Sequence, residues 1–174
     1  ASLQSTVDAA VQTGNNMAIP VEEYTDTIEW MEEELQDEVE DENARIPLDE
    51  TDCNIFYTLN PREPKFFPLS IKAMAKIFYA AKESWTLSSK YYDVTNYGYF
   101  NGNTAEATLI ARNLHDEVLR LKGKRLILGE CGHGSYANRW EGPNYLGHSY
   151  EFDMITAVEL MKEYIDSGRI RLDK

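Results

Sequence analysis

The sequence predicts an α/β fold: a parallel sheet of about four strands flanked by helices, with an N-terminal helical extension. Two observations predict this class. Short apolar strands alternate with amphipathic helices along residues 51–174, an order typical of parallel sheets. Unusual loops follow the strands at 60–68, 96–102 and 129–149. In a parallel sheet such loops meet at the carboxyl edge, where sites form.

Charge is concentrated in one part of the chain. The net charge is -13, and residues 22–52 carry 15 of the 30 acidic residues with one base, Arg45. The remainder is close to neutral, so we expect no nucleic-acid binding through a basic field. Two distant cysteines form no disulfide framework, and no stretch has the length of a membrane span. A cytoplasmic location without direct membrane insertion is therefore expected.

Residues 1–50 are predicted to form the acidic extension, which contains two helices. The first covers Leu3–Thr13 and ends at Gly14. The second begins at Pro20 and runs to about Val39, because apolar residues recur at spacings of three and four. Glutamates cover its other face. Such a face is typical of solvated surface, and the alternative is a docking site for a basic partner.

The α/β domain, residues 51–174, begins with a strand at 51–59. The prolines of 60–68 exclude a helix and predict a rigid, extended loop. Pro68 can then open a helix. The inner face of this helix is expected to comprise Ile71, Met74, Ala75, Phe78 and Ala81. A weak second strand is predicted at 91–95.

The second half of the domain repeats this pattern. Asn103 caps a helix that Gly123 ends, and a buried strand follows at 125–128. The helix after Asn103 is expected to bury Ala107, Ile110, Leu114, Val118 and Leu121. Residues 135–150, after the strand, are poor in helix formers. The chain then has a last helix using Met154, Val158, Met161 and Ile165, and a short strand at 169–172.

The turn Gly129-Glu130-Cys131-Gly132-His133 carries the candidate chemistry, and three interpretations of Cys131 remain open. It resembles a nucleophile elbow with His133 as the base, although the second glycine comes one place late. From the residues alone, the favoured interpretation is a small thiol packed at the end of a strand. The third possibility is a ligand of an iron–sulfur cluster, which ordinarily takes four thiolates. Cys53 lies at the start of its strand, whereas Cys131 follows the end of one, so Cys53 is expected at the opposite edge of the sheet, in the core.

A family resemblance bears on this choice. The runs Asn60-Pro-Arg-Glu-Pro-Lys-Phe-Phe-Pro, Tyr92-Asp-Val-Thr-Asn-Tyr-Gly and Gly129-Glu-Cys-Gly-His stand in order. Together they resemble the heterodisulfide-reductase-related iron–sulfur family, in particular its D-type catalytic subunits and the K subunit of the sulfite-reduction-associated membrane complex. The resemblance covers roughly residues 14–174. The twin cysteine of the family's cysteine-rich CCG domain stands here as Glu130-Cys131, with a carboxylate in place of one thiol.

The resemblance implies an oxidoreductase domain that passes electrons to or from a disulfide- or thiol-type substrate through a [4Fe–4S] cluster. It implies that Cys131 is a metal ligand in a longer protein, with Glu130 and His133 nearby as catalytic groups. Asn60, Arg62 and Lys65 would line the substrate approach. This chain, as a fragment, has too few thiolates for the cluster.

The implied partners are other subunits of a redox complex, at the cytoplasmic side of a membrane. Two alternatives from other classes stay open. One is a cysteine hydrolase that uses Cys131 and His133. The other is a non-catalytic assembly domain that docks a partner through its acidic helix.

Overall fold

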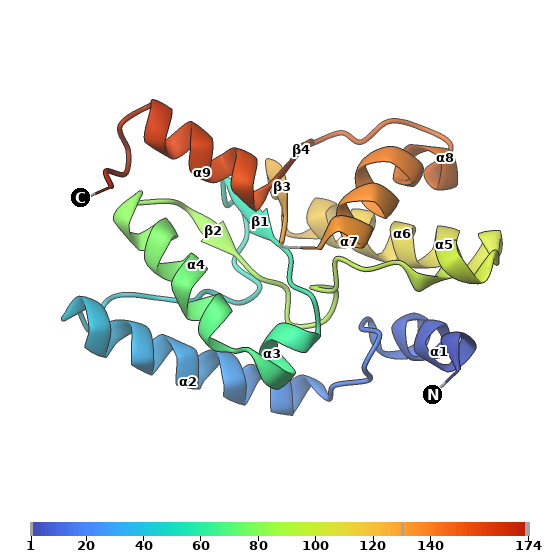
Figure 1. The fold of residues 1–174 in the computed structure, drawn as a ribbon, viewed down its shortest axis with the longest axis horizontal. Helices are drawn as coiled ribbons and strands as arrows, with labels where there is room; N and C mark the ends of the chain where they lie inside the picture. Colours follow the sequence, from blue (N-terminus) through green and yellow to red (C-terminus); the bar gives the residue numbers. More distant parts are fainter. Residues whose placement is uncertain (1, 130, 173–174) are drawn as a thin grey trace.

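The computed structural model describes residues 2–129 and 131–172. Its centre is a parallel sheet of four strands in the order β2-β1-β3-β4 (Figure 1). The strands are β1 (Ile55–Tyr57), β2 (Trp85–Thr86), β3 (Arg125–Leu128) and β4 (Asp153–Thr156). The predicted fold class is confirmed.

Helices cover both faces of this sheet. The longer ones are α1 (Leu3–Thr13), α2 (Val21–Val39), α4 (Leu69–Ala80), α6 (Thr104–Arg120) and α9 (Ala157–Asp166). The shorter ones are α3 (Arg62–Phe66), α5 (Tyr97–Asn101), α7 (Gly132–Tyr136), the π-helical turn η1 (Ala137–Glu141) and α8 (Gly142–Leu146). Among the described residues, no helix combines the length and the apolar character needed to cross a membrane.

Alternate residues of each strand enter two different cores. Ile55 and Tyr57 of β1 pack with buried residues of α2, α4 and α9, whereas Phe56 packs with α6. Figure 1 shows α4 between α2 and the sheet. Period-two alternation in a strand with both faces covered gives this three-layer arrangement. The acidic helix α2 packs on the far side of α4 from the sheet and is part of the same core, with Tyr24 and Leu35 fully buried.

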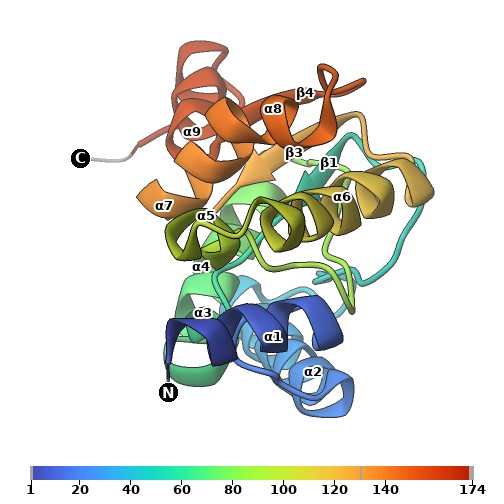
Figure 2. The ribbon, with the colours of Figure 1, turned by 90° about the vertical axis from the view of Figure 1, so that its right-hand side faces the viewer.

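The first helix lies apart from this main core. Val7 and Ala10 of α1 pack against Ile110 of α6, and α1 also contacts α5 (Figure 2). The helix ends, as predicted, at Gly14, which adopts a left-handed φ of 84°. The Cβ of any other residue there would lie 2.5 Å from the carbonyl oxygen of Lys90. Glycine therefore lets the chain turn closely past this segment.

At the C-terminal end the predicted strand was wrong, and the predicted last helix begins later and buries a different face. The strand at the sheet edge is Asp153–Thr156, not residues 169–172, which form no strand. Thr156 then opens α9 through a reciprocal capping box with Glu159. The buried face of α9 consequently comprises Ala157, Leu160 and Tyr164, while Val158 is 70% exposed.

The three segments predicted as loops, 60–68, 96–102 and 129–149, contain helical turns, namely α3, α5 and the run from α7 to α8. Pro61 precedes α3 and Pro64 lies in its first turn, where a missing N–H breaks no helical hydrogen bond. Residues 132–146 are helical throughout, contrary to the prediction.

The second strand also differs from the prediction. Residues 91–95 form only one parallel bridge, between Leu59 and Asp93, and the strand β2 lies earlier in the chain.

Candidate functional site

A cavity of about 420 Å³ lies at the carboxyl edge of the sheet. Its walls come from the end of β1, from the segments that follow β3 and β4, and from one face of α4. The walls are mostly apolar. The apolar lining includes Met74, Ile77, Ala157, Val158 and Met161, and the polar lining includes Glu63, Ser70, Cys131, Ser135 and Thr156. This is the edge at which parallel sheets place their ligands.

Helices begin at this cavity. Thr156 ends β4 and caps α9, and Ser70 lies in the first turn of α4. Both residues line the cavity. Backbone N–H groups at a helix N-terminus carry partial positive charge, and carboxylates already lie beside both starts: Glu159 in the capping box of α9, and Glu63, which accepts a hydrogen bond from the Ser70 hydroxyl. The apolar residues of the lining favour a ligand that is largely apolar.

Cys131 is one of the residues that line this cavity, and its side chain also packs against the core on the α6 side of the sheet. The residue is the N-cap of α7, and its Sγ accepts a hydrogen bond from the backbone N–H of Gly134 at 3.3 Å. The amide Nδ2 of Asn60 points to the same sulfur at 3.9 Å. The side chain is half-buried. N–H donors directed at sulfur stabilise the negative charge that it carries as a nucleophile, leaving group or ligand.

The backbone around Cys131 is that of a strand-to-helix turn. Helix α7 begins at Gly132, one residue after Cys131, and the helical conformation continues to Leu146. Gly134 approaches Val94 so closely that a Cβ would lie 2.6 Å from the Val94 carbonyl oxygen. The turn therefore presents the sulfur at the sheet edge, as a nucleophile elbow does. The expectation that no helix follows Cys131 is corrected.

His133 faces a different surface. Its Nε2 accepts a hydrogen bond from the backbone N–H of Asn96 at 3.0 Å, and its ring packs against Tyr97 and Phe100, with centroids 4.9 and 4.4 Å away. Burial lowers the pKa of His133, which favours the neutral ring. A neutral ring that accepts at Nε2 carries its proton on Nδ1, so neither nitrogen has a lone pair for the thiol proton of Cys131.

Of the three residues predicted to line the substrate approach, only Asn60 lies beside Cys131. Asn60 contacts the Cys131 sulfur, whereas Arg62 is exposed and its Nη1 donates to the Tyr97 hydroxyl at 3.5 Å. Lys65 forms an ion pair with Glu23 of α2. Arg62 and Lys65 are not among the described residues that line the cavity. The cationic approach predicted for an anionic substrate is consequently not formed by these two side chains.

Two further residues complete the predicted set. Glu130, predicted as a catalytic group, lies outside the described residues. Cys53 lies before β1, where it is 8% exposed, and burial raises its pKa. Its carbonyl oxygen accepts a hydrogen bond from the Lys124 N–H ahead of β3. The two cysteines of the chain therefore lie at opposite edges of the sheet, as expected.

Gly129 permits the close approach of β3 and β1 beside the cavity. A Cβ at this position would lie 2.5 Å from the Thr58 carbonyl oxygen. Thr58 cannot move away easily because its N–H donates to the Ile127 carbonyl oxygen at 3.0 Å. Gly129→Ala is therefore expected to lower the free energy of unfolding by about 1–3 kcal/mol, the range for overpacked interiors. Urea unfolding followed by circular dichroism measures this loss.

Gly132→Ala is the matched control for that variant. A Cβ at Gly132 meets no heavy atom within 4 Å, although Gly132 also lines the cavity. Its stability is expected to stay within about 0.5 kcal/mol of the wild type, or to rise slightly. Equal losses in both variants would contradict the explanation by strand approach.

Several cavity residues were not identified from the sequence. Ser70, Ser135 and Thr156 reach the cavity from three separate helix starts. The Thr-x-x-Glu pattern at Thr156 and Glu159 was an available signal, since it marks a helix start directly after a strand. The other two carry no distinctive local pattern.

Comparison of the chain with protein-family models, with curated proteins and with solved structures found no match. The functional assignment therefore depends on the geometry of the cavity and on the chemistry of Cys131.

Proposed function

We propose that this domain binds a small disulfide- or thiol-type molecule in the cavity and exchanges it with the thiol of Cys131. The observation that carries the proposal is that Cys131 is one of the residues lining an apolar cavity of about 420 Å³. A volume in this range accepts a small organic molecule. The proposal keeps the substrate class implied by the family resemblance.

The exchange step needs only the thiol and a disulfide. The deprotonated sulfur of Cys131 attacks one sulfur of the bound disulfide, and the disulfide bond breaks as the new sulfur–sulfur bond forms. The other half leaves as a thiolate and takes up the proton that Cys131 lost. The hydrogen bonds from Gly134 and Asn60 stabilise negative charge on the Cys131 sulfur. Electrons balance without a further oxidant.

The second half of the cycle requires a thiol from another molecule. Cys53 lies at the opposite edge of the sheet and is buried, so it cannot reach the mixed disulfide on Cys131. A second substrate thiol would release the bound half and regenerate Cys131. The cycle therefore converts one disulfide and one thiol into another such pair.

A [4Fe–4S] cluster does not fit the residues of this chain. Such clusters are ordinarily held by four thiolates, and the two cysteines here lie at opposite sheet edges. The other ligands would have to come from another polypeptide or segment. We therefore route no step of the proposal through a cluster.

The two alternatives receive less support. The hydrolase would need a base at Cys131, and His133 makes its hydrogen bond with Asn96 instead. The acidic helix α2 directs part of its charge inward, toward bases of α3 and α4. Its ion pairs are Glu23–Lys65, Glu38–Lys72 and Glu38–Lys76, together with Glu34–Lys72. Exchange at Cys131 is accordingly the function that the geometry favours.

The test is the reaction of the protein with a small aromatic disulfide whose released thiol absorbs visible light. We expect one equivalent of thiol released at Cys131, with a mixed disulfide located there by mass spectrometry. Ala73→Trp, at an exposed position of α4 that lines the cavity, is expected to slow this reaction at least about tenfold. Ala80→Trp, two turns further along α4 and outside the cavity, is the matched control.

Each outcome decides the proposal. Cys131→Ser should abolish release, while Cys53→Ser should leave it unchanged. Equal rates for Ala73→Trp and Ala80→Trp would show that the cavity does not bind the disulfide, and would overturn the proposal. Labelling at Cys53 instead of Cys131 would overturn it as well.

A further inference from the structure

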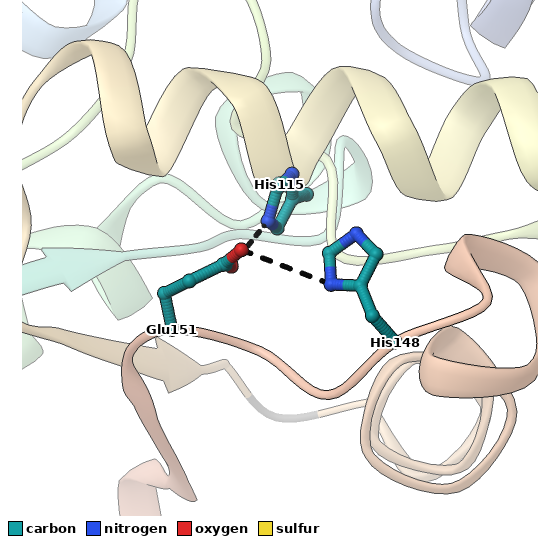
Figure 3. A group of neighbouring side chains, drawn as sticks. All are labelled: His115, His148 and Glu151. Atoms are coloured by element: carbon teal, nitrogen blue, oxygen red, sulfur yellow. Dashed lines mark hydrogen bonds and ion pairs between the residues drawn. The ribbon is translucent and has the colours of Figure 1, made fainter.

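A second group of polar side chains lies on the opposite face of the sheet from α4. His115 belongs to α6, and His148 and Glu151 belong to the segment that connects α8 to β4 (Figure 3). One ligand atom from each of the three lies within 4.8 Å of the other two. Neither histidine nor the glutamate lines the cavity at Cys131. The group is therefore separate from the proposed exchange site.

The distances suit a small divalent ion. The Nε2 of His115 lies 2.7 Å from Oε2 of Glu151, and Nδ1 of His148 lies 3.8 Å from Oε1. Tetrahedral ligands at the Zn–N and Zn–O distances of 2.0–2.2 Å are about 3.4 Å apart. The three donor atoms thus need shifts of little more than about an ångström. His148 Nδ1 also contacts the Ser149 carbonyl oxygen at 2.8 Å, and an ion would replace that contact.

The buried histidine is oriented by a carboxylate. The side chain of His115 is 7% exposed, and its other nitrogen, Nδ1, lies 2.9 Å from Oδ1 of Asp116. Histidine ligands of metals commonly bond a carboxylate through the second nitrogen, which fixes the ring and its tautomer. An Asp116–His115 pair therefore directs Nε2 toward the point where the three side chains converge.

The neighbouring aromatic residues hold the loop in place. Phe152 is buried in the core beneath α6, and the Tyr150 hydroxyl donates to the Asn138 carbonyl oxygen at 2.9 Å. Glu151 lies between these two anchored residues. The ring of His115 packs against both, with centroids 6.1 and 5.9 Å away. Anchoring on both sides lowers the cost of ordering Glu151 around an ion.

We propose that His115, His148 and Glu151 form a binding site for Zn²⁺ or a similar divalent transition-metal ion. Two histidines and one glutamate are a ligand set that zinc uses in sites that keep one position open. His148 and Glu151 are 48% and 54% exposed at their side chains, so a water molecule or an external ligand can take that position. Nitrogen ligands favour such ions over Mg²⁺ and Ca²⁺, which prefer oxygen.

The test uses the whole chain after treatment with a chelator. Calorimetric titration with Zn²⁺ is expected to show one ion bound per chain, and Co²⁺ is expected to give the visible absorption of a tetrahedral site. His148→Ala, at an exposed position, should weaken Zn²⁺ binding at least about 100-fold. Asp116→Asn should weaken it about 10- to 100-fold, because it removes the carboxylate that orients His115.

Cys131→Ser is the control, and its affinity for Zn²⁺ should equal that of the wild type. Because the site contains no cysteine, the Co²⁺ form of either protein should lack the absorption band of a thiolate ligand. The proposal is overturned if the wild type binds no Zn²⁺. It is equally overturned if His148→Ala retains full affinity, since the ion would then bind elsewhere on the chain, or if Cys131→Ser removes binding. Circular dichroism of each variant verifies that it is folded.

Discussion

Phe78→Ala is expected to lower the free energy of unfolding by about 3–5 kcal/mol, the range for removal of a buried phenylalanine ring. Phe78 lies on α4 and is fully buried. Its ring lies 5.4 Å from that of Tyr57 and 4.5 Å from that of Trp85, measured between centroids. These two rings belong to neighbouring strands. Deletion of the Phe78 ring therefore removes contacts that join α4 to the centre of the sheet.

The loss is large compared with the ~5–15 kcal/mol by which a typical domain is stable. Urea unfolding followed by circular dichroism measures it, because fluorescence would also report the altered surroundings of Trp85. Leu69→Ala on the same helix is the control: Leu69 is 59% exposed, and its variant should change stability by no more than about 0.5 kcal/mol. Similar losses in the two variants would show that α4 does not pack on the sheet through Phe78.

Long amphipathic helices were the most predictable part of the fold. Of the apolar stripe that the spacing predicts in α2, Tyr24, Ile28, Met31 and Leu35 are buried, whereas Val21 at the start of the helix is 49% exposed. In α6 the predicted inner face is buried throughout. A stripe that repeats over several turns fits only one period. The alternation of these helices with short strands along the chain in turn predicted the parallel sheet.

Short elements were predicted poorly. The strand Asp153–Thr156 was included in the last helix, because Met154 and Val158 are four residues apart and fit a helical stripe. A strand of four residues cannot be distinguished from a helical turn by period alone. The real α9 face is offset by one position, which exposes Val158 and buries Ala157.

The candidate site was predictable in position but not in detail. Chain order alone places the segments after β1 and β3 at one edge, and Asn60 does reach the sulfur of Cys131. The direction of His133 depends on how α7 turns after Cys131, which no local pattern determines. The His115 group was also missed, because His115 lies more than thirty residues before His148 and Glu151 in the sequence, and the two later residues alone do not indicate a metal site.

Polar groups outside the cavity affect stability, and Asp93 is expected to make the largest pH-dependent contribution. Its carboxylate is 6% exposed and accepts hydrogen bonds from the backbone N–H groups of Asn16 and Thr95, at 2.8 and 2.7 Å. These contacts join the segment before α2 to the sheet edge. Burial raises the pKa of Asp93 to about 6, and the hydrogen bonds oppose this shift only in part.

The folded pKa is therefore higher than the value of about 3.9 in an unfolded chain. Between about pH 4 and pH 6 the folded state retains a proton that the unfolded state has lost, so the contribution of Asp93 is fully present below pH 4 and is lost as the pH rises through 6. The pKa difference corresponds to about 3 kcal/mol. Asp93→Asn cannot titrate, so the stability of the wild type relative to this variant should fall by that amount between pH 4 and pH 7.

Urea unfolding at several pH values measures this difference, and subtraction of the two curves removes the contributions of all other carboxylates. Asp26→Asn, at an exposed position of α2, is the control, and its curve should run parallel to that of the wild type. A constant difference between wild type and Asp93→Asn would show that the Asp93 carboxyl titrates alike in both states. The hydrogen bonds from Asn16 and Thr95 would then fully offset the cost of burying the charge.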